Sequence, residues 1–249
     1  MSETTMDSSL QDTMEEAVQN SPKSSPKISM VRRLILKDWY FQRFTIVAYT
    51  AAGALALALL STGGDAAFFA GSILLVTVLI ALGIHVGMET IVQERTEKTL
   101  AFVMSLPVSP MEYTTAKILA NLLIFLVPWI ILTVGSFGVI AARAAVPDGL
   151  IPFVAIMLTE ILASYCLILA VALVSESQGW TIAAIIAGNL SLQAFMYTAS
   201  HNVVIASTMK TNTIVWSRPA LLFLLGLLVA IVLMLGLTFF FQSRKKDFV

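Results

Sequence analysis

The chain has 249 residues, of which 58% are hydrophobic and only 12% are charged, and its formal net charge is zero. A soluble domain carries about 25% charged residues, so this composition excludes a soluble fold and predicts an integral membrane protein. The balanced charge gives no argument for a nucleic-acid partner, and we expect none.

The first 27 residues differ in composition from the rest of the chain. Serine, threonine, proline and acidic residues dominate them, and the stretch closes with S-P-K-S-S-P-K. Because this segment has almost nothing to bury, we expect residues 1–27 to form a disordered cytoplasmic tail.

Residues 28–43 are predicted to form a helix along the membrane surface ahead of the first span. Four apolar residues share one face of this helix: Ile28, Val31, Leu34 and Ile35. Asp38 interrupts that face. The basic residues of the segment favour a juxtamembrane anchor on anionic lipid headgroups, so membrane lipid is an expected partner.

Six segments are long and apolar enough to cross a bilayer, which requires about 20 residues of helix. They are residues 44–60, 66–88, 116–140, 150–174, 181–199 and 219–241. We therefore predict an all-α integral membrane protein with six transmembrane helices.

The distribution of basic residues predicts the orientation of the chain. Basic residues precede the first span, follow the last span and occupy the 89–117 loop: Arg32, Arg33, Lys37, Arg43, Arg95, Lys98, Lys117, Arg244, Lys245 and Lys246. The positive-inside rule then places both termini in the cytoplasm. Lys210 and Arg218 weaken this bias, because they lie in the 200–218 loop on the opposite side.

The 89–117 loop is short and charged, and it contains clear signals for the end of one helix and the start of another. Three of its apolar residues recur at the i, i+3, i+4 spacing of one helical face: Leu100, Val103 and Met104. Pro107 ends that helix. A second helix begins with a serine N-cap, a proline at the first position and a glutamate at the third: Ser109, Pro110 and Glu112. The pattern predicts a short amphipathic helix, a tight corner and a capped helix that re-enters the membrane.

The residues of this corner resemble the cytoplasmic loop of ABC-2 type transporter permeases. The matching positions are Glu94, Thr99, Leu100, Ser105, Leu106, Pro107, Ser109, Glu112 and Lys117. The resemblance departs at Lys98, where many relatives carry glycine, and at Pro110, where they often carry arginine. In that family the segment is a coupling helix between spans 2 and 3, and it docks on a separate ATPase subunit. The resemblance implies an ATPase contact through Glu94, Arg95, Glu97 and Lys98, with Leu100, Val103 and Met104 seating the apolar face.

The resemblance also implies an overall organisation. Residues 28–249 would be an ABC-2 type transmembrane domain, and residues 28–43 its interfacial connecting helix. The chain would be the permease subunit of an ABC exporter, paired with a second copy or a close relative and with two ATPase subunits. ATP and Mg would bind to the ATPase, and this chain would bind no cofactor. The 200–218 connection would dip towards the membrane, unless it is a loose surface loop.

Polar side chains inside spans are costly, and by default they suggest function. Glu160 lies near the middle of the fourth span without a basic residue in that segment. It could contact a cationic substrate, pair with a donor on another helix, or stay protonated among hydrogen-bond partners. Asn189 and Gln193 lie four residues apart on the fifth span, where they could line a pathway or join helices. All three are candidate residues of the translocation path.

The chain lacks the sequence motifs of an enzyme. It has no phosphate-binding G-x-x-x-x-G-K-[ST] loop and no H-E-x-x-H, and its two histidines are too distant to build a metal site. His85 lies between Gly83 and Gly87, which favours close helix packing. Two rival functions stay open: an ATP-independent secondary carrier or channel, and a non-transporting membrane scaffold.

Overall fold

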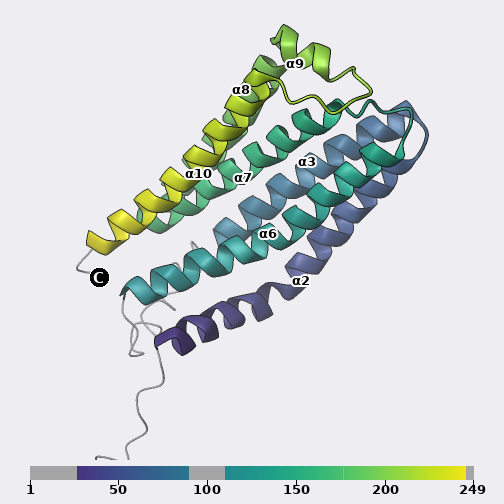
Figure 1. The fold of residues 1–249 in the computed structure, drawn as a ribbon. Helices are drawn as coiled ribbons and strands as arrows, with labels where there is room; N and C mark the ends of the chain where they lie inside the picture. Colours follow the sequence, from purple (N-terminus) through teal and green to yellow (C-terminus); the bar gives the residue numbers. More distant parts are fainter. Residues whose placement is uncertain (1–26, 90–109, 176, 245–249) are drawn as a thin grey trace, which may run out of the picture.

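The computed structural model describes residues 27–89, 110–175 and 177–244 (Figure 1). These residues form helices joined by short connections, and no strand occurs among them. The helices are α2 (Lys27–Ser61), α3 (Asp65–Gly87), α6 (Pro110–Ala142), α7 (Leu150–Ser175), α8 (Gln178–His201), α9 (Val203–Thr208) and α10 (Arg218–Arg244).

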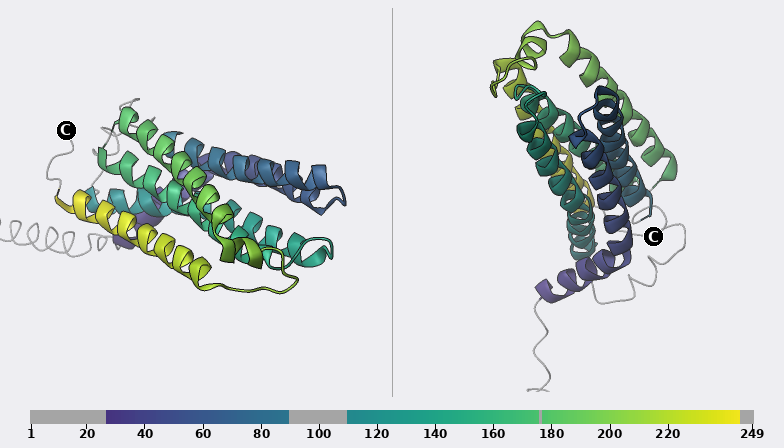
Figure 2. Two further views of the ribbon diagram at one scale, coloured as in Figure 1. Left: turned by 90° about the horizontal axis from the view of Figure 1, so that it is seen from above. Right: turned by 90° about the vertical axis from the view of Figure 1, so that its right-hand side faces the viewer.

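Six of these helices are long and apolar enough to cross a membrane, which confirms the predicted fold class. α9, with six residues, is the short exception. The predicted surface helix and first span are one continuous helix, α2. Its N-terminal part turns away from the axis of the remainder (Figures 1 and 2). The placement of residues 28–43 at the membrane surface stays a prediction.

The third span also begins earlier than its apolar residues indicated. α6 starts at Pro110 rather than near residue 116, and it continues as one helix of 33 residues, with Pro128 inside it. Pro110 at the first helical position agrees with the predicted helix start. The segment leaving the cytoplasmic corner and the third span are therefore one rod.

The helices form an elongated bundle in which α7 is the central element. α2 packs against α3 and α6 on one side, and α8 and α10 pack against α7 on the other. α7 has the largest buried share of the six candidate spans, and its contacts with α3 and α6 join the two sides. Its position explains why the candidate site is built around it.

Two glycines on α3 allow the close approach of α7, as the G-I-H-V-G pattern predicted. A Cβ atom at Gly87 would lie 2.9 Å from Cγ2 of Ile168, and one at Gly83 would lie 3.2 Å from Cδ2 of Tyr165. Both positions therefore have no room for a side chain unless α7 shifts. His85, between them, lies beside Tyr49 of α2, with ring centroids 5.8 Å apart.

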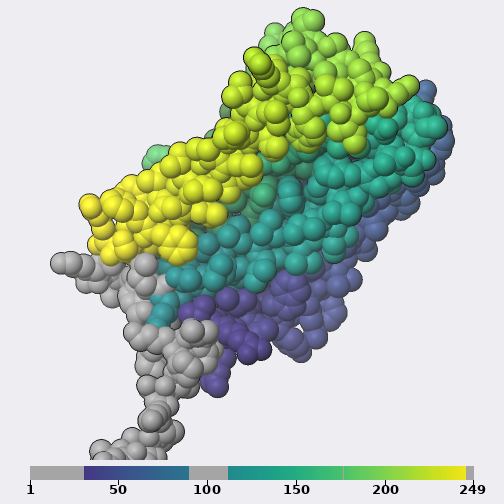
Figure 3. All heavy atoms as spheres, in the orientation of Figure 1, coloured from purple at the N-terminus to yellow at the C-terminus, as the bar shows by residue number. Residues whose placement is uncertain are grey.

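α8 and α10 lie at the periphery of the bundle. The buried residues of α8 follow one narrow stripe: Thr181, Ala184, Gly188, Leu192, Phe195 and Ala199. On α10 only Ala220, Thr238 and Gln242 are buried, and the helix forms a ridge beside α6 on the surface (Figure 3). Five further side chains of α10 are partly buried against the core: Phe223, Leu224, Leu227, Leu235 and Phe239. Many other apolar side chains of the two helices are exposed, as expected for helices against lipid.

The two ends of the described chain, at Lys27 and Arg244, lie at the same end of the bundle (Figure 1). The connections 62–64, 143–149 and 202–217 lie at the other end. This arrangement is the one that an even number of spans requires. The assignment of the first end to the cytoplasm is the prediction of the positive-inside rule.

The connection before the last span is a packed structure rather than a loose loop. Asn202 caps α9 by accepting hydrogen bonds from the backbone N–H groups of Val204 and Ile205. Ile205 is buried. The carbonyl of Thr211 accepts a hydrogen bond of 2.9 Å from the N–H of Gly149. The connection is thereby tied to the turn between α6 and α7.

Candidate functional site

Two adjoining cavities lie along α7, with α3 and α8 as the walls on either side. The larger cavity, of about 620 Å³, is in the half of the bundle towards α9, and its lining is mostly apolar. Its polar lining residues are Ser72, Thr77, Ser136 and Gln193. Small-molecule sites are typically about 300–1,000 Å³, so this cavity has the size of a ligand site.

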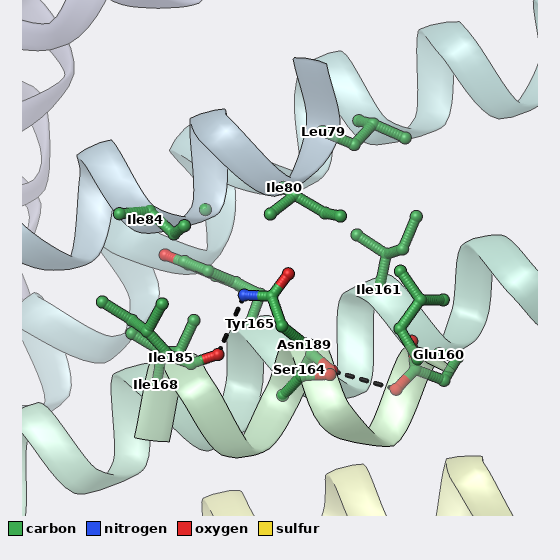
Figure 4. Close-up of a pocket in the computed structure, with 13 residues that line it drawn as sticks. Leu79, Ile80, Ile84, Glu160, Ile161, Ser164, Tyr165, Ile168, Ile185 and Asn189 are labelled. Carbon is green, nitrogen blue, oxygen red and sulfur yellow. Dashed lines mark hydrogen bonds between the residues drawn. The ribbon is translucent and has the colours of Figure 1, made fainter. Parts of the chain in front are cut away.

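The smaller cavity, of about 20 Å³, lies next to the larger one, and Leu192 contributes to both. Figure 4 shows its lining: Glu160, Ser164 and Asn189 are its polar side chains, among isoleucines of α3, α7 and α8. About 10–15 Å³ of such volume is enough for one water molecule. The smaller cavity is therefore a mostly apolar recess of about one small group, with a few polar side chains in its wall.

Glu160 is the most deeply buried acidic side chain in the described part of the chain, with only 2% of its surface exposed. Ser164, one turn further along α7, donates a hydrogen bond of 3.0 Å to its Oε1 (Figure 4). Ser191 of α8 is a second hydroxyl group close to the carboxyl group. Even so, Oε2 has no partner in hydrogen-bond geometry among the described residues.

Within the described ranges, none of the lysine, arginine or histidine side chains forms an ion pair with Glu160. A buried carboxylate without a countercharge is very costly. The group is stable there only when it carries a proton or when a cation from outside this part of the chain approaches it. Of the three alternatives drawn from the sequence, a donor on another helix has a candidate in Ser191 of α8, and no basic side chain among the described residues takes that place.

Asn189 and Gln193 lie along the same groove, but each belongs to a different cavity. Asn189 borders the smaller cavity and donates a hydrogen bond of 2.9 Å to the carbonyl of Ile185 in its own helix. Gln193 borders the larger cavity. Neither amide is hydrogen-bonded to another helix within the part of the chain that the structure describes. Their place in the translocation path stays a prediction.

The end of the bundle at which the described chain begins and ends holds a buried ion pair that the sequence did not reveal. Nζ of Lys117 on α6 donates to Oδ2 of Asp38 on α2 at 2.8 Å. Both residues are buried, with 5% and 7% of their surfaces exposed. The interpretation of Lys117 as a loop charge that only marks orientation was incomplete, because this lysine lies inside a helix and pairs with the acid that interrupts the apolar face of residues 28–43.

A chain of buried contacts continues from this ion pair to α7. Asn121, one turn after Lys117, donates to the Lys117 carbonyl at 2.8 Å, and the Tyr165 hydroxyl donates to the Asn121 carbonyl at 2.9 Å. The rings of Tyr165 and Phe125 stack with their centroids 4.0 Å apart. These contacts connect α2, α6 and α7 at a depth where sequence reasoning found no site.

Most of the predicted ATPase contact lies outside the described residues. This applies to Glu94, Arg95, Glu97, Lys98, Leu100, Val103 and Met104, and to the corner residues Pro107 and Ser109. Glu112 is described, and it lies in the first turn of α6. An acidic residue there is favourable, since the N-terminus of a helix carries a partial positive charge.

Comparison with known families identifies the class of protein. The family model described as "ABC-2 family transporter protein" matches residues 2–214. The chain therefore belongs to the ABC-2 family of transporter proteins. Searches among curated proteins and among solved structures found no match.

Family membership and the six apolar helices together define a multi-pass membrane protein with the role of a transport permease. The permeases of this family are the membrane component of an ABC transporter, which implies an ATPase partner.

Proposed function

We propose that this chain is the permease of an ABC exporter and that it works as a homodimer, or with a close relative, together with two ATPase subunits. The ATPase docks on the 94–106 helix, and ATP and Mg bind to that partner. Closure of the ATPase dimer pushes on this helix and shifts the bundle between inward-open and outward-open states. Such coupling requires an element with two discrete arrangements that both sites bias.

The observation that carries this proposal is the continuity of α6. Its 33 residues, at ~1.5 Å per residue, give a rod of about 50 Å. The rod begins at Pro110, directly after the predicted docking segment. Near its other end, Ser136, Val139 and Ile140 border the larger cavity. A displacement at the docking corner would therefore be carried to the cavity wall along a single helix, in which Pro128 removes one backbone hydrogen bond.

The buried ion pair supports the same mechanism. Asp38 and Lys117 hold the N-terminal part of α2 against the first turns of α6. A push on the corner would move the two segments together. The proposed translocation path is the groove along α7, with Glu160, Asn189 and Gln193 as its polar residues.

The proposal is tested by purifying the full-length chain in mild detergent from its native cell and identifying stoichiometric partners by mass. A co-purifying protein with ATP-binding-cassette motifs is the expected result. Scrambling residues 94–106 should abolish the association. The double variant Glu94→Lys/Glu97→Lys should uncouple ATP hydrolysis from transport while the bundle stays folded. Glu15→Lys/Glu16→Lys, the same change of charge in the predicted tail, is the matched control and should leave coupling intact.

Other outcomes would favour the rival functions. A chain that purifies alone and moves solute into liposomes without ATP would be a carrier or channel. If the chain moved no solute, and its cellular function tolerated simultaneous polar substitutions at Glu160, Asn189 and Gln193, the scaffold would be favoured. Intact coupling in the Glu94→Lys/Glu97→Lys variant would refute the assigned docking surface alone.

A further inference from the structure

We propose that the substrate is a hydrophobic molecule that carries a protonated amine: its apolar body occupies the larger cavity and its ammonium group binds Glu160. This inference rests on the proposed function, because it takes the two cavities as part of the translocation path. It adds the chemical class of the substrate, which neither the family nor the fold supplies.

The larger cavity determines the body of the substrate. Aromatic and aliphatic side chains form most of its wall, including Phe68, Phe69, Phe153, Met157 and Met196. Its polar groups are hydroxyls and one amide, and no charged side chain borders it among the described residues. Such a surface favours an apolar guest, since burying apolar area in it is favourable by about 25 cal/mol per Å². Methionine side chains also adapt to guests of different shape.

The smaller cavity determines the polar group. Oε2 of Glu160 is a buried acceptor without a hydrogen-bond partner among the described residues, whereas Oε1 already accepts from Ser164. Ser164 and Ser191 bring only neutral hydroxyl groups to this carboxyl group, and the cost of a buried carboxylate favours a donor with a positive charge for Oε2. An ammonium group supplies both. A neutral alcohol supplies only the donor, and an anion supplies neither.

The spacing of the two cavities sets the position of the amine relative to the body. Met157 of the larger cavity precedes Glu160 by three residues on α7, and Gln193 follows Asn189 by four on α8. Each interval is about one helical turn, a rise of ~5 Å. Leu192 borders both cavities, so they adjoin. One molecule can therefore occupy both when Leu192 moves aside and the amine stands a few bonds from the apolar body.

The test uses two fluorescent probes of the same shape, 1-pyrenemethylamine, which is protonated at neutral pH, and 1-pyrenemethanol. The full-length chain is placed in lipid nanodiscs, and binding is followed by energy transfer from its four tryptophans to pyrene. Empty nanodiscs report partition into lipid. The wild-type chain should bind the amine about tenfold more tightly than the alcohol, as expected for a hydrogen bond to a charged group.

Glu160→Gln should reduce this preference to less than about twofold and leave the affinity for the alcohol unchanged. A control variant should keep the preference: Asp148→Asn removes a carboxylate that borders neither cavity. If Glu160→Gln does not yield folded protein, Glu160→Asp, which withdraws the carboxylate by one methylene, should weaken the preference.

Equal affinity of the wild-type chain for the two probes would overturn the inference, and so would an amine preference that survives in Glu160→Gln. Both results would leave the permease function intact, because the association with an ATPase is measured separately. Conversely, a chain that prefers the amine but purifies without an ATPase would contradict the proposed function and keep the amine site.

Discussion

Lys117 and Asp38, 79 residues apart in the chain, form an ion pair of 2.8 Å that is buried between α2 and α6. Lys37 lies beside the same carboxylate at 3.7 Å, but 43% of its side chain is exposed. Lys117 and Lys37 therefore allow the effects of a buried and an exposed positive charge on the same carboxylate to be compared.

Removing one partner of the buried pair should destabilise the bundle. Lys117→Met leaves the buried Asp38 with only the half-exposed Lys37 at 3.7 Å, and breaking a buried pair typically costs about 3–5 kcal/mol. Thermal unfolding in nanodiscs should show a large drop in Tm. Lys37→Met, the matched control, should change stability by less than about 1 kcal/mol, since exposed ion pairs contribute little. A similar drop in both variants would contradict the special role of Lys117.

Exchanging the two charges of this pair should preserve part of its stabilising effect. Asp38→Lys combined with Lys117→Asp restores opposite charges across the α2–α6 contact. The double variant should therefore be more stable than the sum of the two single changes predicts, by a coupling of about 0.5–3 kcal/mol. If the effects of the two changes simply add, the two side chains do not depend on each other.

The close packing of α3 on α7 should depend on Gly87, and Gly226 on α10 provides a control. Gly87→Ala places a Cβ atom 2.9 Å from Ile168 and should destabilise the chain by about 1–3 kcal/mol through overpacking. Gly226 on α10 has nothing within 4 Å of the corresponding position. Gly226→Ala should be neutral or slightly stabilising, because alanine favours helix over glycine. Unfolding temperatures of the two variants, compared in one lipid, check this.

Filling the larger cavity should weaken both pyrene probes, whatever their charge. Met157→Trp adds an aromatic ring at the cavity wall and removes room for the apolar body. Binding of the amine and of the alcohol should then fall together, by about tenfold, which corresponds to a loss of 1.4 kcal/mol. Leu222→Trp on the exposed face of α10 is the matched control and should leave both affinities unchanged. A loss confined to the amine would place the apolar body elsewhere.

Much of the fold was predictable because its determinants are local. Six apolar segments identify six helices, and Pro110 marks the start of the helix that re-enters the membrane. Gly83 and Gly87 identified a packing face correctly. Apolar segments of this length form helices in a membrane, since a backbone in lipid must satisfy its own hydrogen bonds.

The features that sequence reasoning missed depend on long-range contacts. Asp38 was taken as a flaw in an apolar face and Lys117 as a marker of orientation, since nothing local indicates that they meet. The two opposite charges lie in the N-terminal parts of two neighbouring helices, and that is the signal that could have paired them. The hydrogen bond between Tyr165 and Asn121 gave no such signal, because a tyrosine in a span is equally typical of plain packing.

The candidate site shows the same division. Glu160 could be selected from sequence because an acid in a span is rare. Its free carboxyl oxygen and the adjoining cavity required the structure, since they depend on how α3, α7 and α8 lie together. The assignment of Asn189 and Gln193 to separate cavities was likewise invisible, because both lie on the same side of one helix.

The central position of α7 has a consequence for how substrate range can change during evolution. This helix forms part of both cavities and also carries most of the packing between the two halves of the bundle. A substitution on it that altered selectivity would tend to compromise folding as well. The wall on α8 carries little of that packing, so relatives that handle different cargo should diverge mainly there.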